Sequence, residues 1–276
     1  MSIIRYGLIV LLIPVHIWLT QASVELTGGD IERGAHGMSG KLISLLSLDF
    51  RGLAADSKML DAVFYVGGKI GRKETLTESD WDYYGHLINA SLEIDPYFFD
   101  VYYFASSMLA WEAKRYEEAV AVLEKGAEKL PSNKRILFNL GFIHYYFLGN
   151  NLEAAKYIGE AAKLPGAPPH YATLASRLAY DSGSHQMAMG MISEMLDRTS
   201  NESVRRYYMK RLTALDRAVT LEKKAHIYRE RNGSFPERLL ELKKAGLIDE
   251  IPADPYGGEY YINDRGRVYS TSKFVD

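Results

Sequence analysis

Three prolines divide the middle of this chain at nearly constant intervals. Pro96, Pro131 and Pro165 lie 35 and 34 residues apart, and each closes a segment whose apolar residues follow helical spacing. A period of about 34 residues is the length of one helix–turn–helix unit in arrays of repeated helical hairpins. The spacing therefore predicts a stack of such hairpins.

Two units in the middle of the chain show the pattern most clearly. They run from Asp100 to Pro131 and from Arg135 to Pro165. Before them, helical spacing predicts a helix from about Ile43 to Val66, ended by Gly67-Gly68, and a second helix that ends before the first of the three prolines. After them, a weaker hairpin is predicted from Tyr171 to about Leu196.

Large and small residues in the two clear units fit close packing of helices. They are Tyr103, Tyr116, Ala119, Leu140 and Gly141. Small residues are needed where two helix axes approach to about 8–10 Å, and Ser107 is predicted to replace the glycine at that point in the earlier unit. Over roughly residues 45–198 the pattern resembles the tetratricopeptide repeat (TPR) family. The resemblance implies an α-solenoid whose concave surface binds protein.

The end of the chain follows a different pattern. Apolar residues predict a long helix from Glu202 to Arg231 that caps the stack and is ended by Asn232-Gly233. A short leucine-rich helix is predicted between Ser234 and Gly246. Alternating residues over 259–271, around a turn at 263–266, predict a β-hairpin.

This tail resembles the C-terminal part of type II secretion pseudopilins. The shared motifs that follow the long helix are Phe235-Pro236, Ile251-Pro252, Asp254-Pro255-Tyr256-Gly257 and Tyr260. The N-terminus lacks the Gly-Phe-Thr-Leu-x-Glu cleavage motif of that family, so the chain is not interpreted as a pilin subunit. Some pseudopilins hold calcium in this region. Here the carboxylates of the tail are interpreted as caps of turns, and no metal or other cofactor is expected.

Together these patterns predict an all-α chain: a TPR-like α-solenoid of about four helical hairpins, with a long C-terminal helix and a small terminal β-hairpin. The expected divisions are a transmembrane anchor or signal segment at 1–23, a glycine-rich linker at 24–41, TPR-like repeats at 42–198, a long capping helix at 199–232 and a pseudopilin-like module at 233–276.

The first 23 residues indicate export from the cytoplasm. The segment from Ile3 to Ala22, which contains an apolar run from Tyr6 to Thr20, would form a helix of roughly 30 Å, just long enough to span a bilayer. Arg5 before the run and acidic residues after it favour an N-terminus inside and the bulk of the chain outside. A secretory signal cleaved after Thr20-Gln21-Ala22 stays open as an alternative. The protein is expected at the inner membrane of a bacterium with its bulk in the periplasm, or free in the periplasm if the segment is cleaved.

Composition excludes several kinds of site. The chain has no cysteine, which rules out disulfides, thiolate metal sites and a cysteine nucleophile. Its seven histidines are scattered without the spacing of a zinc motif, and no nucleophile elbow, P-loop or dinucleotide fingerprint occurs. The net charge of −2 gives no general attraction to nucleic acid, and the basic residues of the long helix are interpreted as a solvated face. The sequence therefore does not predict an enzyme or a nucleic-acid-binding protein.

The first helices of the two clear units supply the candidate binding residues. In the TPR family this helix lines the concave surface, so the resemblance implies a groove formed by Val101, Phe104, Met108, Trp111, Arg135, Phe138, Phe142 and Tyr145. Aromatic rings and one cation, exposed together, would suit an amphipathic helix or an extended peptide. The alternative is that these side chains pack against a neighbouring unit or the long helix.

The expected function is that of a membrane-anchored scaffold that binds or assembles proteins in the bacterial cell envelope. Its partners would be a protein or peptide in the groove and the membrane at the N-terminal helix. The alternative is an accessory or structural component of a type II secretion or type IV pilus-like machine, which would engage pilins through the C-terminal module.

Overall fold

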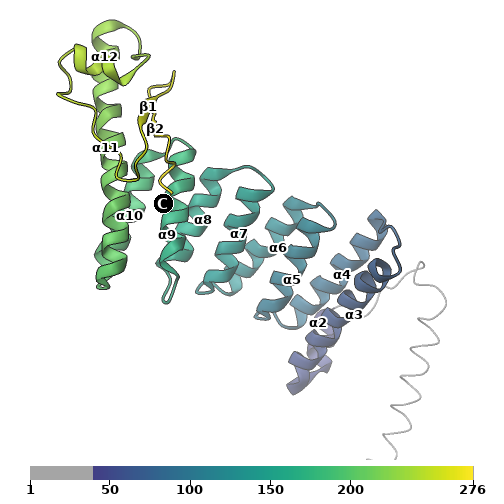
Figure 1. Ribbon diagram of the computed structural model, residues 1–276. Helices are drawn as coiled ribbons and strands as arrows, with labels where there is room; N and C mark the ends of the chain where they lie inside the picture. The colour runs from purple at the N-terminus through teal and green to yellow at the C-terminus, as the bar shows by residue number, and fades with distance from the viewer. Residues whose placement is uncertain (1–39, 276) are drawn as a thin grey trace, which may run out of the picture.

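The computed structural model describes residues 40–275, which are mostly helical with one small antiparallel sheet (Figure 1). The elements are α2 (Gly40–Leu46), η1 (Leu48–Phe50), α3 (Arg51–Gly71), α4 (Glu78–Ile94), α5 (Phe99–Trp111), α6 (Tyr116–Lys129), α7 (Lys134–Tyr146), α8 (Asn151–Lys163), α9 (Pro169–Asp181), α10 (His185–Arg198), α11 (Glu202–Asn232), α12 (Leu239–Lys244), β1 (Tyr260–Ile262) and β2 (Val268–Ser270). The predicted all-α class with a terminal hairpin is confirmed at this level. The predicted segment 1–23 and most of the predicted linker lie outside the described residues.

Helices that follow one another in sequence also pack against one another, and they form an elongated row from α2 and α3 at one end to α11 at the other (Figure 1). The helices α5, α7 and α9 begin at residues 99, 134 and 169, each 35 residues after the one before. Their partners α6, α8 and α10 begin at residues 116, 151 and 185. Each of the three evenly spaced prolines lies two residues beyond a helix end, where it prevents the helix from continuing.

The buried residues repeat with the same period. Fully buried residues recur at equivalent positions of the first helices (Ala105, Leu140, Ala175) and of the second helices (Ala119, Ala154, Ala188). Their small or branched side chains allow each pair of helices to pack closely. The period of the sequence is therefore the interval at which buried residues recur in successive pairs of helices.

Gly141 marks the closest approach of α7 to α8. A Cβ atom at this position would lie 2.4 Å from Cγ1 of Ile158, so only glycine fits. The residue 35 positions earlier is Ser106, which is buried, whereas Ser107 is partly exposed. The prediction for Ser107 is therefore wrong by one position.

The first pair of helices departs from the prediction in two places. Gly67-Gly68 does not end the helix, because α3 continues to Gly71 and the left-handed residue that follows it is Lys73, with φ of 58°. The predicted single helix is also interrupted at Ser47, whose hydroxyl donates to the Ile43 carbonyl at 2.5 Å and competes with the helical hydrogen bonds. The helix α2 begins at Gly40, inside the predicted linker.

The start of α4 is fixed by a capping box. The Thr77 side chain accepts a hydrogen bond from the Asp80 amide, and Oδ2 of Asp80 accepts one from the Thr77 amide at 2.8 Å. The buried Asp80 carboxylate also accepts from Lys69 Nζ at 2.6 Å and from the Tyr65 hydroxyl. Burial alone would raise the pKa of Asp80, but these donors hold it well below its usual range. Asp80 therefore stays ionised and ties α3 to α4.

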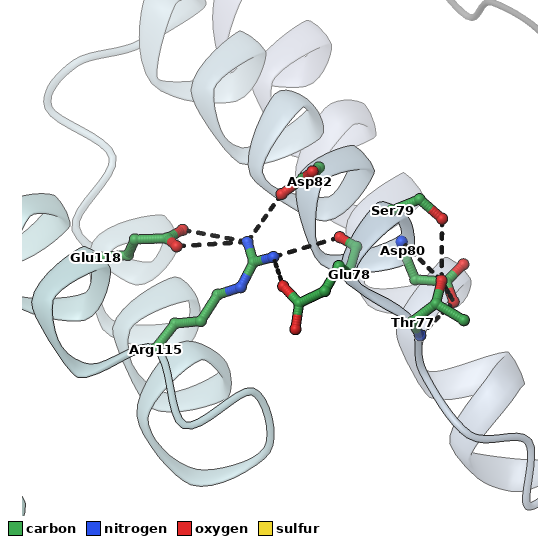
Figure 2. Close-up of polar contacts among 7 residues, drawn as sticks. All are labelled: Thr77, Glu78, Ser79, Asp80, Asp82, Arg115 and Glu118. Atoms are coloured by element: carbon green, nitrogen blue, oxygen red, sulfur yellow. Dashed lines mark hydrogen bonds and ion pairs between the residues drawn. The ribbon is translucent and has the colours of Figure 1, made fainter.

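Arg115, which directly precedes α6, connects the start of α4 to the pair formed by α5 and α6 (Figure 2). Its guanidinium donates to the carboxylate of Glu78 and, at 2.9 Å, to Oδ1 of Asp82, and Glu118 contributes a third carboxylate at 3.4 Å. The hydrogen bond with Glu78 raises the pKa of Arg115 further above its ordinary value. The Arg115 side chain is 16% exposed, whereas its acidic partners face solvent. We term this set the Arg115 network.

The C-terminal end of the row is closed by α11, α12 and the hairpin (Figure 1). The helix α11 ends at Gly233, which adopts the left-handed conformation with φ of 83°, as predicted. The short helix α12 begins later than predicted, at Leu239, where the Arg238 amide donates to Glu241. Gly246, with φ of 68°, follows its end as predicted.

The hairpin is attached to the helices by buried polar contacts. The Tyr180 hydroxyl donates to the Val268 carbonyl at 3.0 Å, and the Tyr260 hydroxyl donates to a carbonyl of α11 at 2.9 Å. Glu222 accepts from the Val268 amide at 2.9 Å and lies 2.7 Å from Nδ1 of the buried His185. The tail therefore belongs to the same core as α8–α11.

Candidate protein-binding face

The predicted groove residues on α5 separate into buried and exposed positions. Val101 is fully buried in the core between α5 and its neighbours, so its assignment to a groove is a correction to the prediction. Phe104 and Met108 are half-buried and pack against the same core, where the Phe104 ring lies 6.4 Å from that of Tyr84. Trp111 is 52% exposed. On this helix, Trp111 is the predicted residue most available to a partner.

An aromatic cluster surrounds Trp111 at the ends of α5 and α7. The Trp111 ring centre lies 5.4 Å from that of Tyr146 and 4.8 Å from that of Phe147. Phe142 stacks on Tyr146 at 5.4 Å, and Tyr116 stacks on Phe147 at 5.1 Å. These contacts hold the exposed rings in defined orientations, which limits the side-chain entropy that binding would remove.

A second cluster lies around Arg135, near the starts of α5 and α7. The Arg135 guanidinium lies 4.7 Å from the ring centre of Phe99 and 5.9 Å from that of Tyr103, which are cation–π distances. Phe138 stacks on Tyr171 of α9 at 4.4 Å. The single predicted cation is therefore exposed but already held by aromatic rings.

Both clusters are formed mainly by residues of α5 and α7, the first helices of two successive pairs. We term this surface the aromatic face and define it by Phe99, Tyr103, Trp111, Arg135, Phe138, Phe142, Tyr145 and Tyr146. Tyr145 and Tyr146 are both exposed, at 39% and 57%. The face thus contains the predicted residues Trp111, Arg135, Phe138, Phe142 and Tyr145. It does not contain Val101, which is buried, or Phe104 and Met108, which are half-buried against the core.

Several residues of the face were not in the predicted groove. Tyr146 lies 35 residues after Trp111 and contacts it, so the repeat period applied to exposed positions could have found it. Tyr103, predicted as a packing residue, is 44% exposed and lies 35 residues before Phe138. Phe99 has no aromatic counterpart one period later, and its place on the face follows from its contact with Arg135.

The aromatic face offers aromatic rings and a guanidinium. The neighbouring His144 is stacked on Tyr157 of α8, and burial lowers the pKa of its imidazole. Among residues 40–275, no three histidine or acidic side chains are grouped so as to hold a metal ion. In the same part of the chain, no helix has both the length and the hydropathy needed to cross a membrane.

Comparison of the chain with protein-family models and with curated proteins gives no match. The resemblances to TPR proteins and to pseudopilins therefore stay predictions that depend on residues and geometry.

Proposed function

We propose that this protein is a membrane-tethered, TPR-like scaffold of the bacterial cell envelope that binds a protein or peptide on its aromatic face. The proposal rests on one observation above all: exposed rings on α5 and α7 lie side by side at the period of the helical pairs. Trp, Tyr and Arg, which dominate this face, are the residues enriched at the energetic centres of protein interfaces. The proposed tether is the apolar segment at 1–23, with the repeats on the periplasmic side.

The shape and chemistry of the face favour an extended peptide or one side of an amphipathic helix. Rings from two parallel helices offer apolar contact along a line, and Arg135 adds one site for a carboxylate or a backbone carbonyl. One guanidinium is too little charge to follow a nucleic-acid backbone, which requires several phosphate contacts. The proposed activity is therefore protein binding, without catalysis and without a cofactor.

The test compares variants of the immobilised full-length protein as bait for envelope extracts. Trp111→Ala and Tyr145→Ala should each weaken the binding of the recovered partner. A central aromatic contributes about 2 kcal/mol, which corresponds to roughly 30-fold in affinity. Tyr261→Ala, an exposed tyrosine on β1, is the matched control and should bind as the unchanged protein does. Equal affinity for all variants would sink the proposal, and thermal unfolding checks that each variant is folded.

A second candidate function is favoured by the tail. Leu240 and Ile251 are exposed on a module that is attached to α11 by the hydrogen bond of Tyr260, and this module has the motifs of the pseudopilin resemblance. Removing the module would uncover the core that contains Phe274, so point substitutions are the cleaner test. If the tail engages a secretion or pilus machine, Leu240→Ala with Ile251→Ala should impair secretion or piliation while Trp111→Ala does not. The opposite result favours the aromatic face.

A further inference from the structure

The N-terminal elements α2, η1 and α3 expose a series of large apolar residues. They are Leu45, Leu46, Phe50, Leu53, Leu60 and Phe64, each between 49% and 72% exposed, and we term them the N-terminal apolar face. On α3, Leu53, Leu60 and Phe64 recur at helical spacing, on the side opposite to the fully buried Ala55 and Ala62. This end of the row is drawn in purple in Figure 1.

This face differs from the other end of the row. There, α11 and the hairpin cover the last helical pair, and Leu221, Val268 and Phe274 are buried. Full burial of a Leu or Phe side chain contributes about 1.5–3 kcal/mol of favourable free energy. Covering the six exposed side chains would therefore be strongly favourable. Several large apolar residues exposed on one side of a helix mark an interaction with protein or with membrane.

The position of the face in the chain points to membrane. The predicted span at Ile3–Ala22 is joined to Gly40 by residues 23–39, and a flexible linker of that length has a root-mean-square reach of roughly 20–25 Å. A tether in the bilayer would therefore hold α2 and α3 close to its surface. Exposed basic residues (Lys41, Arg51, Lys73) and exposed acidic residues (Asp49, Asp56, Asp61) both occur between Gly40 and Lys73, so the apolar side chains and the tether, not the charge, favour the membrane.

Two other occupants fit less well. The run from Tyr6 to Thr20 is apolar except for His16 and Thr20, so packing it on α3 would bury one side and leave most of its apolar surface in water. A second copy of the chain would also be tethered, and its own face would have the same access to lipid. The bilayer would remove both the apolar segment and the N-terminal apolar face from water.

We propose that the N-terminal apolar face lies in the headgroup region of the membrane that holds the tether, with α3 parallel to the surface. This inference rests on the proposed tether. In this arrangement the row of helices leaves the membrane from α3 onward, so the aromatic face on α5 and α7 is held at a short, fixed distance from the lipid.

The absence of cysteine makes the test direct, because one introduced cysteine gives one label. Full-length Phe64→Cys and Leu53→Cys are labelled with an environment-sensitive nitrobenzoxadiazole dye and reconstituted into phosphatidylethanolamine–phosphatidylglycerol vesicles. Some of the vesicles contain lipid with a nitroxide high on the acyl chain. Tyr261→Cys, at the far end of the row, is the control. At positions 53 and 64 we expect a blue shift and a severalfold loss of emission with nitroxide lipid, and at position 261 neither.

The outcomes separate this inference from the tether. Resistance of the vesicle-bound protein to alkaline carbonate extraction reports the tether independently of the dye. If the protein resists extraction but positions 53 and 64 keep a water-like, unquenched emission, the membrane-lying face is wrong and the tether stands. A blue shift without quenching would show that protein, either the chain's own segment or a second copy, covers the face, and this also overturns the inference. Loss of the protein on extraction overturns both.

Discussion

Asp254 shows how one residue organises the tail. Its buried carboxylate accepts hydrogen bonds from the hydroxyls of Ser270 and Ser272 and from the Tyr256 amide at 2.9 Å. Burial by itself would raise the pKa of Asp254, but the three donors outweigh it and lower the pKa below its ordinary value. The carboxylate therefore joins the Asp-Pro-Tyr-Gly turn to the strand and turn that end the hairpin.

Asp254→Asn should lower the free energy of unfolding at pH 7 by about 1–3 kcal/mol, the usual effect of losing hydrogen bonds to a charged group. Because the pKa of Asp254 is depressed in the folded protein, its stabilisation is present above the unfolded pKa of about 4 and is lost as the pH falls below it. The difference from the unchanged protein should therefore shrink between pH 5 and pH 3 in urea titrations. Asp264→Asn, in the exposed turn of the same hairpin, is the control and should change little. A difference that is independent of pH would contradict this role.

At the residue scale, sequence reasoning found the motif but not its partners. The turn chemistry of Asp254-Pro255-Tyr256-Gly257 is local and could be predicted, whereas Ser270 and Ser272 lie 16 and 18 residues further along the chain. The same limit applies to Val101, because helical spacing places it among apolar neighbours but does not say which side of α5 faces the core. A register error of one residue rotates a helical position by about 100°, which is how Ser107 was predicted in place of Ser106.

At the scale of elements, the close contact of α7 and α8 at Gly141 makes a sharp prediction. Gly141→Ala would place a Cβ atom 2.4 Å from Ile158 and 2.9 Å from the Ala154 carbonyl, so α7 and α8 would have to separate. The expected loss is about 1–3 kcal/mol, typical of overpacking. Gly190→Ala is the matched control, because Gly190 is also inside a helix and a Cβ there meets nothing within 4 Å. That variant should be neutral or more stable by up to about 1 kcal/mol. Denaturant unfolding of both variants measures the contrast, and equal effects would contradict it.

The ends of most elements followed from local signals, and the exceptions have physical causes. Helix-breaking prolines and the left-handed glycines after α11 and α12 mark chain reversals that no packing can override. Gly67-Gly68 failed as a signal, because glycine permits a left-handed turn but does not impose one, and neither glycine has a positive φ. For the aromatic face, periodicity predicted the helices, but the contacts between clusters depend on how α5 and α7 lie together.

At the scale of the whole molecule, the tail should unfold together with the helices it covers. Phe274 is 1% exposed, its ring centre lies 4.5 Å from that of Tyr180, and its carbonyl accepts from Arg211 at 2.6 Å. Phe274→Ala should therefore lower the free energy of unfolding by about 3–5 kcal/mol, as measured by helical circular dichroism in urea. Val275→Ala, at the exposed neighbouring residue, should have little effect. An unchanged helical transition in Phe274→Ala would show that the tail is a separate unit.

The Arg115 network has a mechanical consequence for the row of helices. Helical pairs joined in series transmit force through every junction, so a load between the N-terminal helices and the tail must pass from α4 to α5 and α6. At that junction the Arg115 network joins the helices through ion pairs of Arg115 with Glu78, Asp82 and Glu118, and the three carboxylates face water. Charges in water are screened within about 8 Å at physiological ionic strength. The bending stiffness of this joint therefore depends on the salt around it, and the row of helices would bend more easily as the ionic strength of its surroundings rises.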